Sequence, residues 1–244
     1  MEVHHHSHTS RKKWTHYFWE FLMLFLAVFC GFLAEYQLEH VIENQREKKY
    51  ILSFIEDLKA DTTKIDQVLE ASIEQQKGFD SLMGVLKEAD FVNNPARFEN
   101  YSVHIFGLFA FFQTDRTLQQ LKNAGGLRLI RNQAASDSIV SYDNMVKEVA
   151  EQKEDLYDAN RGAAGLALEI FDFNGVNNPL INRNLVRRPE KLNLLTADLA
   201  KLGQFFNTVL GFKITSIIYC SLLEGLKSYA ERLIIFLKKE YHLK

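Results

Sequence analysis

Four histidines stand close together at the start of the chain, at His4, His5, His6 and His8. Imidazole is a common ligand of Zn²⁺ and other transition metals, so this run could bind such an ion. Four histidines without a fold around them specify no closed coordination geometry. We therefore interpret residues 1–13 as a His-rich tail with no metal site, in which these four histidines are the candidate ligands. We expect no other cofactor.

His16 and Glu20 are four residues apart, which places them on one face of a helix. In an oligomer such a pair could carry protons. A functional carboxylate within a membrane usually lies deeper, beside a second charged helix. Anchoring at a membrane boundary is therefore the preferred interpretation of this pair.

Carboxylates recur at helical spacing in two further places. One stripe consists of Glu35, Glu39, Glu43 and Glu47, and a second cluster consists of Glu148, Glu151, Glu154, Asp155 and Asp158. A di-iron bundle would need a Glu-x-x-His motif on two helices, which the sequence after the first stripe lacks. Lysines interleave the second cluster. Both groups are typical of solvated helix faces.

The remaining chemical motifs also favour structural roles. Gly125 and Gly126 lack the following Lys-Ser/Thr of a phosphate-binding loop, so they indicate the end of a helix. Cys220 lies among Ile217, Ile218 and Leu222, which we expect to be core, and is predicted to be buried. Loop arginines, Arg183, Arg187 and Arg188, could receive an anion. No convergent catalytic cluster emerges, and we expect no enzymatic activity.

An apolar run near the N-terminus contains or adjoins the first of the candidate residues, His16 and Glu20. Residues 21–34 span about 21 Å as a helix, which is short for a hydrocarbon layer of about 30 Å. Aromatic residues on either side extend the run to spanning length. We predict a transmembrane helix over residues 14–36, with membrane-boundary residues at Trp14, Tyr17, Trp19, Glu20 and Tyr36.

The charges that flank this run predict its direction. Arg11, Lys12 and Lys13 precede it, whereas the charged residues that follow it are all acidic until Arg46. The positive-inside rule then keeps the N-terminal tail in the cytoplasm and exports the rest. A cleaved signal peptide is the alternative. Phe32 occupies a position where cleavage after Ala34 would need a small residue, which favours a retained anchor.

Helical periodicity continues through most of the remaining chain. A packing seam, interrupted by Thr62 and Gln76, runs from Ile51 to Leu86, and residues 91–100 are the first break in the helical pattern. Residues 101–112 are the most apolar exported segment; we predict a buried helix there, with a membrane-touching or partner-touching patch as the alternative. Thr114 or Asp115 is expected to cap a helix that ends at the glycine pair.

Two long helices complete the pattern. One is predicted to begin after Asn132, with Asn132 or Ser136 as its cap, and the last to run over residues 196–241. An Asn-rich break over residues 174–189 separates them. Residues 205–223 could be taken for a second membrane span. Lys213 at the middle of this stretch makes that interpretation costly.

Composition agrees with a folded helical protein. The chain has 244 residues, of which 47% are hydrophobic and only 3 are Pro, so it can form one sizeable domain beyond an anchor. Its formal net charge of −2 gives no electrostatic reason to expect a nucleic-acid partner. Cys30 lies in the apolar run and Cys220 far from it, so no disulfide is predicted.

Three segments carry a resemblance to known sequences. KKWTHYFWEFLMLFLAVFCGFLAEYQLEH, followed by REKKYILSFIEDLKADT, resembles the opening of uncharacterised single-pass membrane proteins of Bacteroidota, and TLQQLKNAGGLRLIRNQAASDSIVSYD is similar to a middle segment of related families. The resemblance implies a location in the inner membrane of a Gram-negative bacterium. It implies no activity.

The sequence thus predicts an all-α protein in which a transmembrane helix continues into an antiparallel bundle of about four long helices, with residues 37–244 in the periplasm. The expected partners are the lipid bilayer and either further copies of the chain or other envelope proteins. The leading hypothesis is an oligomeric scaffold or interaction protein. The alternative is a ligand-sensing or signalling module.

Overall fold

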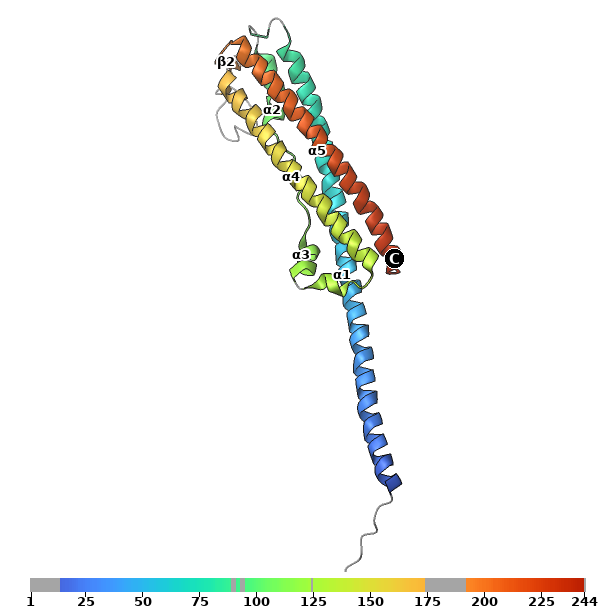
Figure 1. Cartoon of the computed structure of the whole chain (residues 1–244). Coiled ribbons are helices and arrows are strands. Elements are labelled where there is room, and N and C mark those ends of the chain that lie inside the picture. The colour runs from blue at the N-terminus through green and yellow to red at the C-terminus, as the bar shows by residue number, and fades with distance from the viewer. Residues whose placement is uncertain (1–13, 89–90, 93–94, 124, 174–191, 244) are drawn as a thin grey trace, which may run out of the picture. The chain divides into compact units, whose positions relative to one another are not determined.

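The computed structural model describes residues 14–88, 91–92, 95–123, 125–173 and 192–243. Its helices are α1 (Trp14–Leu86), α2 (Glu99–Phe106), α3 (Arg116–Asn123), α4 (Gln133–Ile170) and α5 (Leu199–Glu240) (Figure 1). Short 3₁₀ turns cover Pro95–Phe98 and Gly126–Leu129. The two-residue strands β1 (Phe171–Asp172) and β2 (Asn193–Leu194) pair antiparallel. The prediction of an all-α protein is confirmed.

The chain divides into two compact units, residues 1–50 and 51–244. In the first unit, the described residues all belong to α1. In the second unit, the remainder of α1 joins the other elements. The apolar seam predicted from Ile51 onward is largely buried there, including Ile51, Ile55, Leu58, Ile65 and Phe79.

Helix boundaries follow the capping signals in the sequence. The side chain of Asn132 accepts a hydrogen bond from the Ala135 backbone N–H at 3.1 Å, which starts α4 as predicted. Asp198 caps α5 in the same way through the Ala200 N–H at 2.9 Å. Gly125 adopts a left-handed φ of 62° just after α3. The predicted helices are thus present, with Asn132 capping α4 as expected, whereas the expected cap of α3 by Thr114 or Asp115 is replaced by Asp57, described below.

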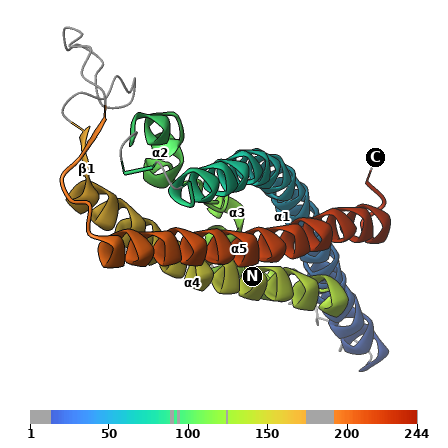
Figure 2. The ribbon, with the colours of Figure 1, turned by 90° about the horizontal axis from the view of Figure 1, so that it is seen from above.

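α4 and α5 lie side by side and run in opposite directions (Figures 1 and 2). Lys201, near the start of α5, pairs with Glu169 near the end of α4 at 2.9 Å. At the other end, the Asn132 amide donates to Glu240 at 3.0 Å. Contacts between the beginning of one helix and the end of the other fix an antiparallel register.

α5 also runs antiparallel to the part of α1 that belongs to the second unit. Phe79 packs on Phe212, with ring centroids 4.8 Å apart. Lys227, further along α5, pairs with the earlier α1 residue Asp66 at 2.6 Å. The long helices of this unit are therefore α5, α4 and residues 51–86 of α1, with α5 opposed to the other two.

The segment predicted as a buried helix, residues 101–112, is helical only as far as Phe106. α2 ends at Phe106, and residues 107–115 continue as an irregular, extended segment, which we call the strap. Of the apolar residues there, Phe111 is buried, whereas Leu108, Phe109 and Phe112 are exposed. The described residues contain three long helices, so the expectation of about four is not confirmed. The reason lies in the side chains that bind the strap backbone, described below.

Candidate functional site

The first unit presents an apolar helix surface. Two helices of the described chain, α1 and α5, are long and apolar enough to cross a membrane, and no residue in the most apolar stretch of α1 is buried. Large apolar side chains are exposed throughout this stretch of α1, among them Phe21, Met23, Leu24, Phe25, Val28 and Phe32. Exposing so much apolar surface to water is unfavourable, whereas contact with an apolar medium would remove it from water.

The predicted boundary residues lie at the two ends of this surface. Trp14, Tyr17, Trp19 and Tyr36 are all exposed on α1. Nε2 of His16 lies 3.0 Å from a carboxylate oxygen of Glu20, which confirms that these two residues face one another. The pair is accordingly a local contact on one helix, at the end of the apolar surface.

In the second unit, two buried aspartates of α1 receive the end of the strap. One Asp57 oxygen accepts from the Thr117 backbone N–H at 2.9 Å, and the other from Arg116 at 2.9 Å. Asp57 thereby acts as an N-cap for α3 supplied from another helix. One turn further along α1, Asp61 accepts from the Thr114 N–H at 2.6 Å.

The other end of the strap is bound by two amide side chains. Nε2 of Gln75 donates to the carbonyls of His104 and Gly107, both at 2.7 Å. From α4, Nδ2 of Asn160 donates to the carbonyls of Ile105 at 2.7 Å and of Gly107 at 3.3 Å. The Gly107 carbonyl therefore receives one donor from each of two helices.

The middle of the strap is bound by α5 and α1. The Phe111 N–H donates to the Tyr219 hydroxyl at 2.9 Å. Lys64 donates to the Phe112 carbonyl at 3.1 Å and to the Thr114 hydroxyl at 2.8 Å. Side chains of three helices thus supply the hydrogen bonds that an α-helix would have made internally, which explains why the strap is extended.

The electrostatics of this site follow from burial. Burial raises the pKa of Asp61 despite the hydrogen bonds from Thr114 and Tyr142 and the nearby Lys64 ammonium. It also raises the pKa of the Tyr142 hydroxyl, and the adjacent Asp61 and Asp57 raise it further. Tyr142 therefore stays a hydrogen-bond donor. Each oxygen of Asp61 accepts one bond, from the Thr114 N–H and from the Tyr142 hydroxyl, so this carboxyl joins the strap to α4.

A second buried polar group lies between α1 and α5. Gln76 donates to the Ser216 hydroxyl at 3.0 Å and to the Cys220 sulfur at 3.6 Å. Burial raises the pKa of the Cys220 thiol despite hydrogen bonds from Ser72, Ser216 and Gln76. A protonated, buried thiol is a poor nucleophile. The predicted burial of Cys220 is confirmed, whereas the prediction that Ile217 and Ile218 are core is wrong, because both are 47% exposed.

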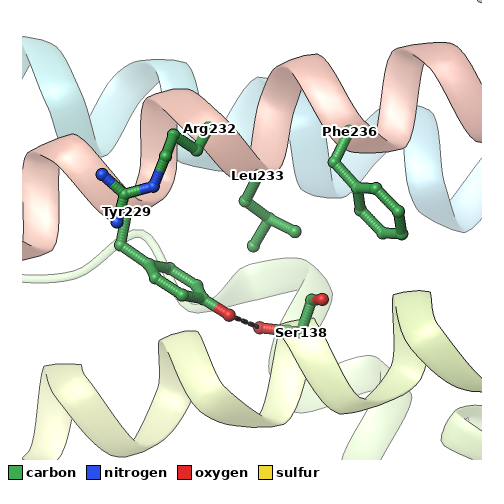
Figure 3. Close-up of a pocket in the computed structure, with 5 residues that line it drawn as sticks. All are labelled: Ser138, Tyr229, Arg232, Leu233 and Phe236. Carbon is green, nitrogen blue, oxygen red and sulfur yellow. Dashed lines mark hydrogen bonds between the residues drawn. The ribbon is translucent and has the colours of Figure 1, made fainter.

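A small pocket lies between α4 and α5 (Figure 3). Its volume is about 150 Å³, and it is lined by Ser138, Tyr229, Arg232, Leu233 and Phe236. The Tyr229 hydroxyl donates to the Ser138 carbonyl at 3.2 Å, and the Arg232 guanidinium carbon lies 5.9 Å from the Tyr229 ring centroid. The hydroxyl already has a partner, so the pocket offers a single cation beside an apolar wall.

Several residues predicted as candidate ligands of a metal ion or an anion have no site in the structure. The tail histidines His4, His5, His6 and His8, and the loop arginines Arg183, Arg187 and Arg188, lie outside the described residues. Within the described part of the chain, no group of three or more His, Cys, Asp or Glu residues could hold a metal ion. The acidic cluster lies on the exposed side of α4, and its Asp158 pairs with Arg161. The acidic stripe of α1, expected from the sequence to be a solvated face, is not solvated throughout, because Glu47 is buried.

The strap site was missed at the level of the sequence. Its residues are Asp57, Asp61, Lys64, Gln75, Asn160 and Tyr219. One signal was available: Asp57 and Asp61 flank the buried Leu58 at helical spacing, so they interrupt an apolar seam with carboxylates. No family model, curated protein or solved structure matches this chain.

Proposed function

We propose that this protein is a membrane-anchored helical scaffold, whose N-terminal transmembrane helix over residues 14–36 holds a periplasmic bundle, and that it is not an enzyme. The bundle comprises α4, α5 and residues 51–86 of α1, with the strap in place of a fourth long helix. The partners are the lipid bilayer and further copies of the chain. The scaffold presents helix surfaces rather than a reactive site.

One observation carries this proposal: α1 exposes the apolar side chains of residues 14–36, whereas its apolar positions from Ile51 onward are largely buried. Phe21 is 65% exposed and Leu24 is 71% exposed, whereas Ile51 and Leu58 are fully buried. Burying apolar surface contributes about 25 cal/mol per Å². A bilayer is the environment that would bury about 20 consecutive apolar residues on all sides of a single helix.

The orientation rests on charge. Arg11, Lys12 and Lys13 precede the apolar surface, and carboxylates follow it. This asymmetry favours a cytoplasmic N-terminus and a periplasmic second unit in the inner membrane.

The two sides of the anchor differ in a way that favours self-association. Phe21, Phe25 and Phe29 form a stacked row, with ring centroids 6.2 and 5.9 Å apart. Ala27, Gly31 and other small residues lie on the opposite side of the same helix at helical spacing. Small residues allow transmembrane helices to approach closely, whereas a phenylalanine row suits lipid contact.

The proposal is tested by topology and fractionation of the full chain. We expect the protein to stay in carbonate-washed membranes, to keep its N-terminus at Met1, and to activate a periplasmic reporter fused after Lys244. A matched variant, Leu24→Arg with Val28→Arg, should leave the membrane fraction, because two charges at mid-span cost about 5 kcal/mol or more. A mature protein that begins after Ala34, or an active cytosolic reporter, would overturn the proposal.

A ligand-sensing module is the second candidate, and the strap favours it. Polar side chains, rather than a regular helix, bind residues 107–115, so this segment has a defined bound arrangement that a ligand could displace. Amide exchange of the Phe111 and Thr114 N–H groups tests this role. Exchange that accelerates on addition of a periplasmic extract would support sensing, and unchanged protection would count against it.

A further inference from the structure

α5 carries an exposed aliphatic face that the proposed function does not use. Leu210 is 38% exposed, Ile214 is 50% exposed, and Ile217 and Ile218 are each 47% exposed. Their spacing of four, three and one residues places all four on one side of the helix. Isolated exposed apolar residues are ordinary, but a contiguous group marks an interaction surface. We call these four residues the α5 face.

The exposed side of α4 provides an internal comparison. Over residues 144–161 its exposed positions are mostly charged or polar, including Lys147, Glu148, Glu151 and Glu154. α4 and α5 lie side by side in the same unit (Figures 1 and 2). The aliphatic surface is thus a property of α5 in particular.

Two ion pairs join α5 to α1 beside the α5 face. Lys213 pairs with Asp80 of α1 at 2.5 Å, and Lys227 pairs with Asp66 of α1 at 2.6 Å. Between the two aspartates, α1 adds the side chain of Ile73, which is 48% exposed. Lys213, the residue that argues against a membrane span over residues 205–223, therefore points toward α1 and away from the α5 face.

We propose that the α5 face is the contact between two copies of this chain, with the α5 helices packed side by side. This inference rests on the proposed function, because anchors in one bilayer concentrate the copies and give them a common direction. Under two-fold symmetry, the neutral aliphatic face of one copy then meets the same surface of the other, with Ile214 and Ile217 at the centre.

The chemistry of the face favours a helix over a lipid surface. It contains no aromatic residue, and its nearest lysines are already paired, whereas interfacial helices display aromatic and free basic residues. Gly211 and Gly225 have open space where a Cβ atom would stand, so a neighbouring backbone could approach there. β-branched isoleucines at successive seam positions are typical of helix pairs.

Disulfide crosslinking of the full-length protein in its membranes tests the contact. A Cys30→Ala background removes the exposed native thiol and leaves only the buried Cys220. Into it we would place Ile214→Cys or Ile217→Cys on α5, and Glu148→Cys on the charged side of α4 as the matched control. We expect about tenfold more covalent dimer from either α5 variant than from the control after mild oxidation.

A second variant separates this contact from the anchor. Ile214→Asp with Ile217→Asp changes only exposed side chains, so the helical content and the membrane fraction should be unchanged while the crosslinkable dimer is lost. Equal, low crosslinking of all three cysteine variants in protein that remains membrane-bound would overturn the α5 contact alone. Labelling of Ile217→Cys by a lipid-soluble reagent would likewise overturn it, since lipid would then cover the face. Loss of the wild-type chain from the membrane would instead overturn the proposed function.

Discussion

The hydroxyl of Tyr142 on α4 donates to Oδ2 of Asp61 on α1 at 2.7 Å, while Oδ1 of the same carboxylate accepts from the Thr114 N–H of the strap at 2.6 Å. One side chain therefore joins two long helices and the segment between them. Tyr142 is fully buried, and its ring stands edge-on to Phe54, with centroids 6.1 Å apart. This junction is where the polar contacts of the strap meet the apolar core.

Replacing Asp61 by Ala should lower the free energy of unfolding by about 2–4 kcal/mol. The substitution leaves two buried donors, the Thr114 N–H and the Tyr142 hydroxyl, without an acceptor. Urea denaturation of the wild type and the variant measures the difference. Tyr142→Phe serves as the partial control, because it removes one of the two bonds without opening a cavity, and should cost about 1 kcal/mol. Equal losses in the two variants would show that the strap bond contributes nothing.

The pH dependence of stability should report the buried carboxyl of Asp61. Burial raises its folded-state pKa above the ordinary value of 3.8. Its contribution to stability is therefore fully present below 3.8 and is lost as the pH rises through the folded-state pKa. Asn resembles the neutral carboxyl, so wild type should gain stability relative to Asp61→Asn as the pH falls from 7 to about 4. Urea midpoints at several pH values measure this change.

Asp143 provides a control of opposite sign. Burial tends to raise its pKa, but hydrogen bonds from Lys122 and Lys147 outweigh burial and hold the pKa below its ordinary value of 3.8. Its contribution is present above 3.8 and is lost as the pH falls through the folded-state pKa. The advantage of wild type over Asp143→Asn should therefore shrink in acid. If the stability difference between wild type and variant changes with pH in the same direction for Asp61→Asn and Asp143→Asn, the direction assigned to at least one of the two pKa shifts is wrong.

Local signals in the sequence determine where α3, α4 and α5 lie. Asn132 is a strong N-cap residue, and Gly125 adopts a left-handed conformation that other residues disfavour, so both boundaries depend on single residues. The strap could not be predicted in this way. Its composition suits a buried helix, and its extended form depends on Gln75, Asn160 and Tyr219, which are distant in the sequence.

The exposed face of α5 was equally difficult to predict, for a different reason. Apolar residues occur nearly all around this helix, so periodicity does not distinguish the side that packs from the side that does not. Phe212 and Ile217 fit the same helical pattern, yet Phe212 is fully buried against Phe79 and Ile217 is exposed. Only the position of α1 decides between them.

Replacing Gln75 by Ala should loosen the strap selectively. Gln75 is buried, and its amide donates to two carbonyls, so the variant should lose about 1–3 kcal/mol of stability. Hydrogen exchange of the Phe111 and Thr114 amides should accelerate more than exchange in α4. The neighbouring Gln76→Ala is the matched control, because Gln76 contacts Ser216 of α5 instead, and its strap amides should keep their protection. Comparable acceleration in both variants would indicate general destabilisation.

Two glycines of α1 should respond in opposite ways to replacement by Ala. A Cβ atom at Gly78 would overlap the imidazole of His104, which packs α2 against α1, whereas a Cβ atom at Gly84 would meet nothing within 4 Å. Gly78→Ala must displace that ring and should cost about 1–3 kcal/mol. Gly84→Ala should instead stabilise by about 0.5–1 kcal/mol, because alanine favours the helix. Thermal unfolding of the two variants tests this difference, and His104→Gly combined with Gly78→Ala should recover part of the loss by removing the ring. A similar gain from Ala at both positions would mean that α2 does not pack against Gly78.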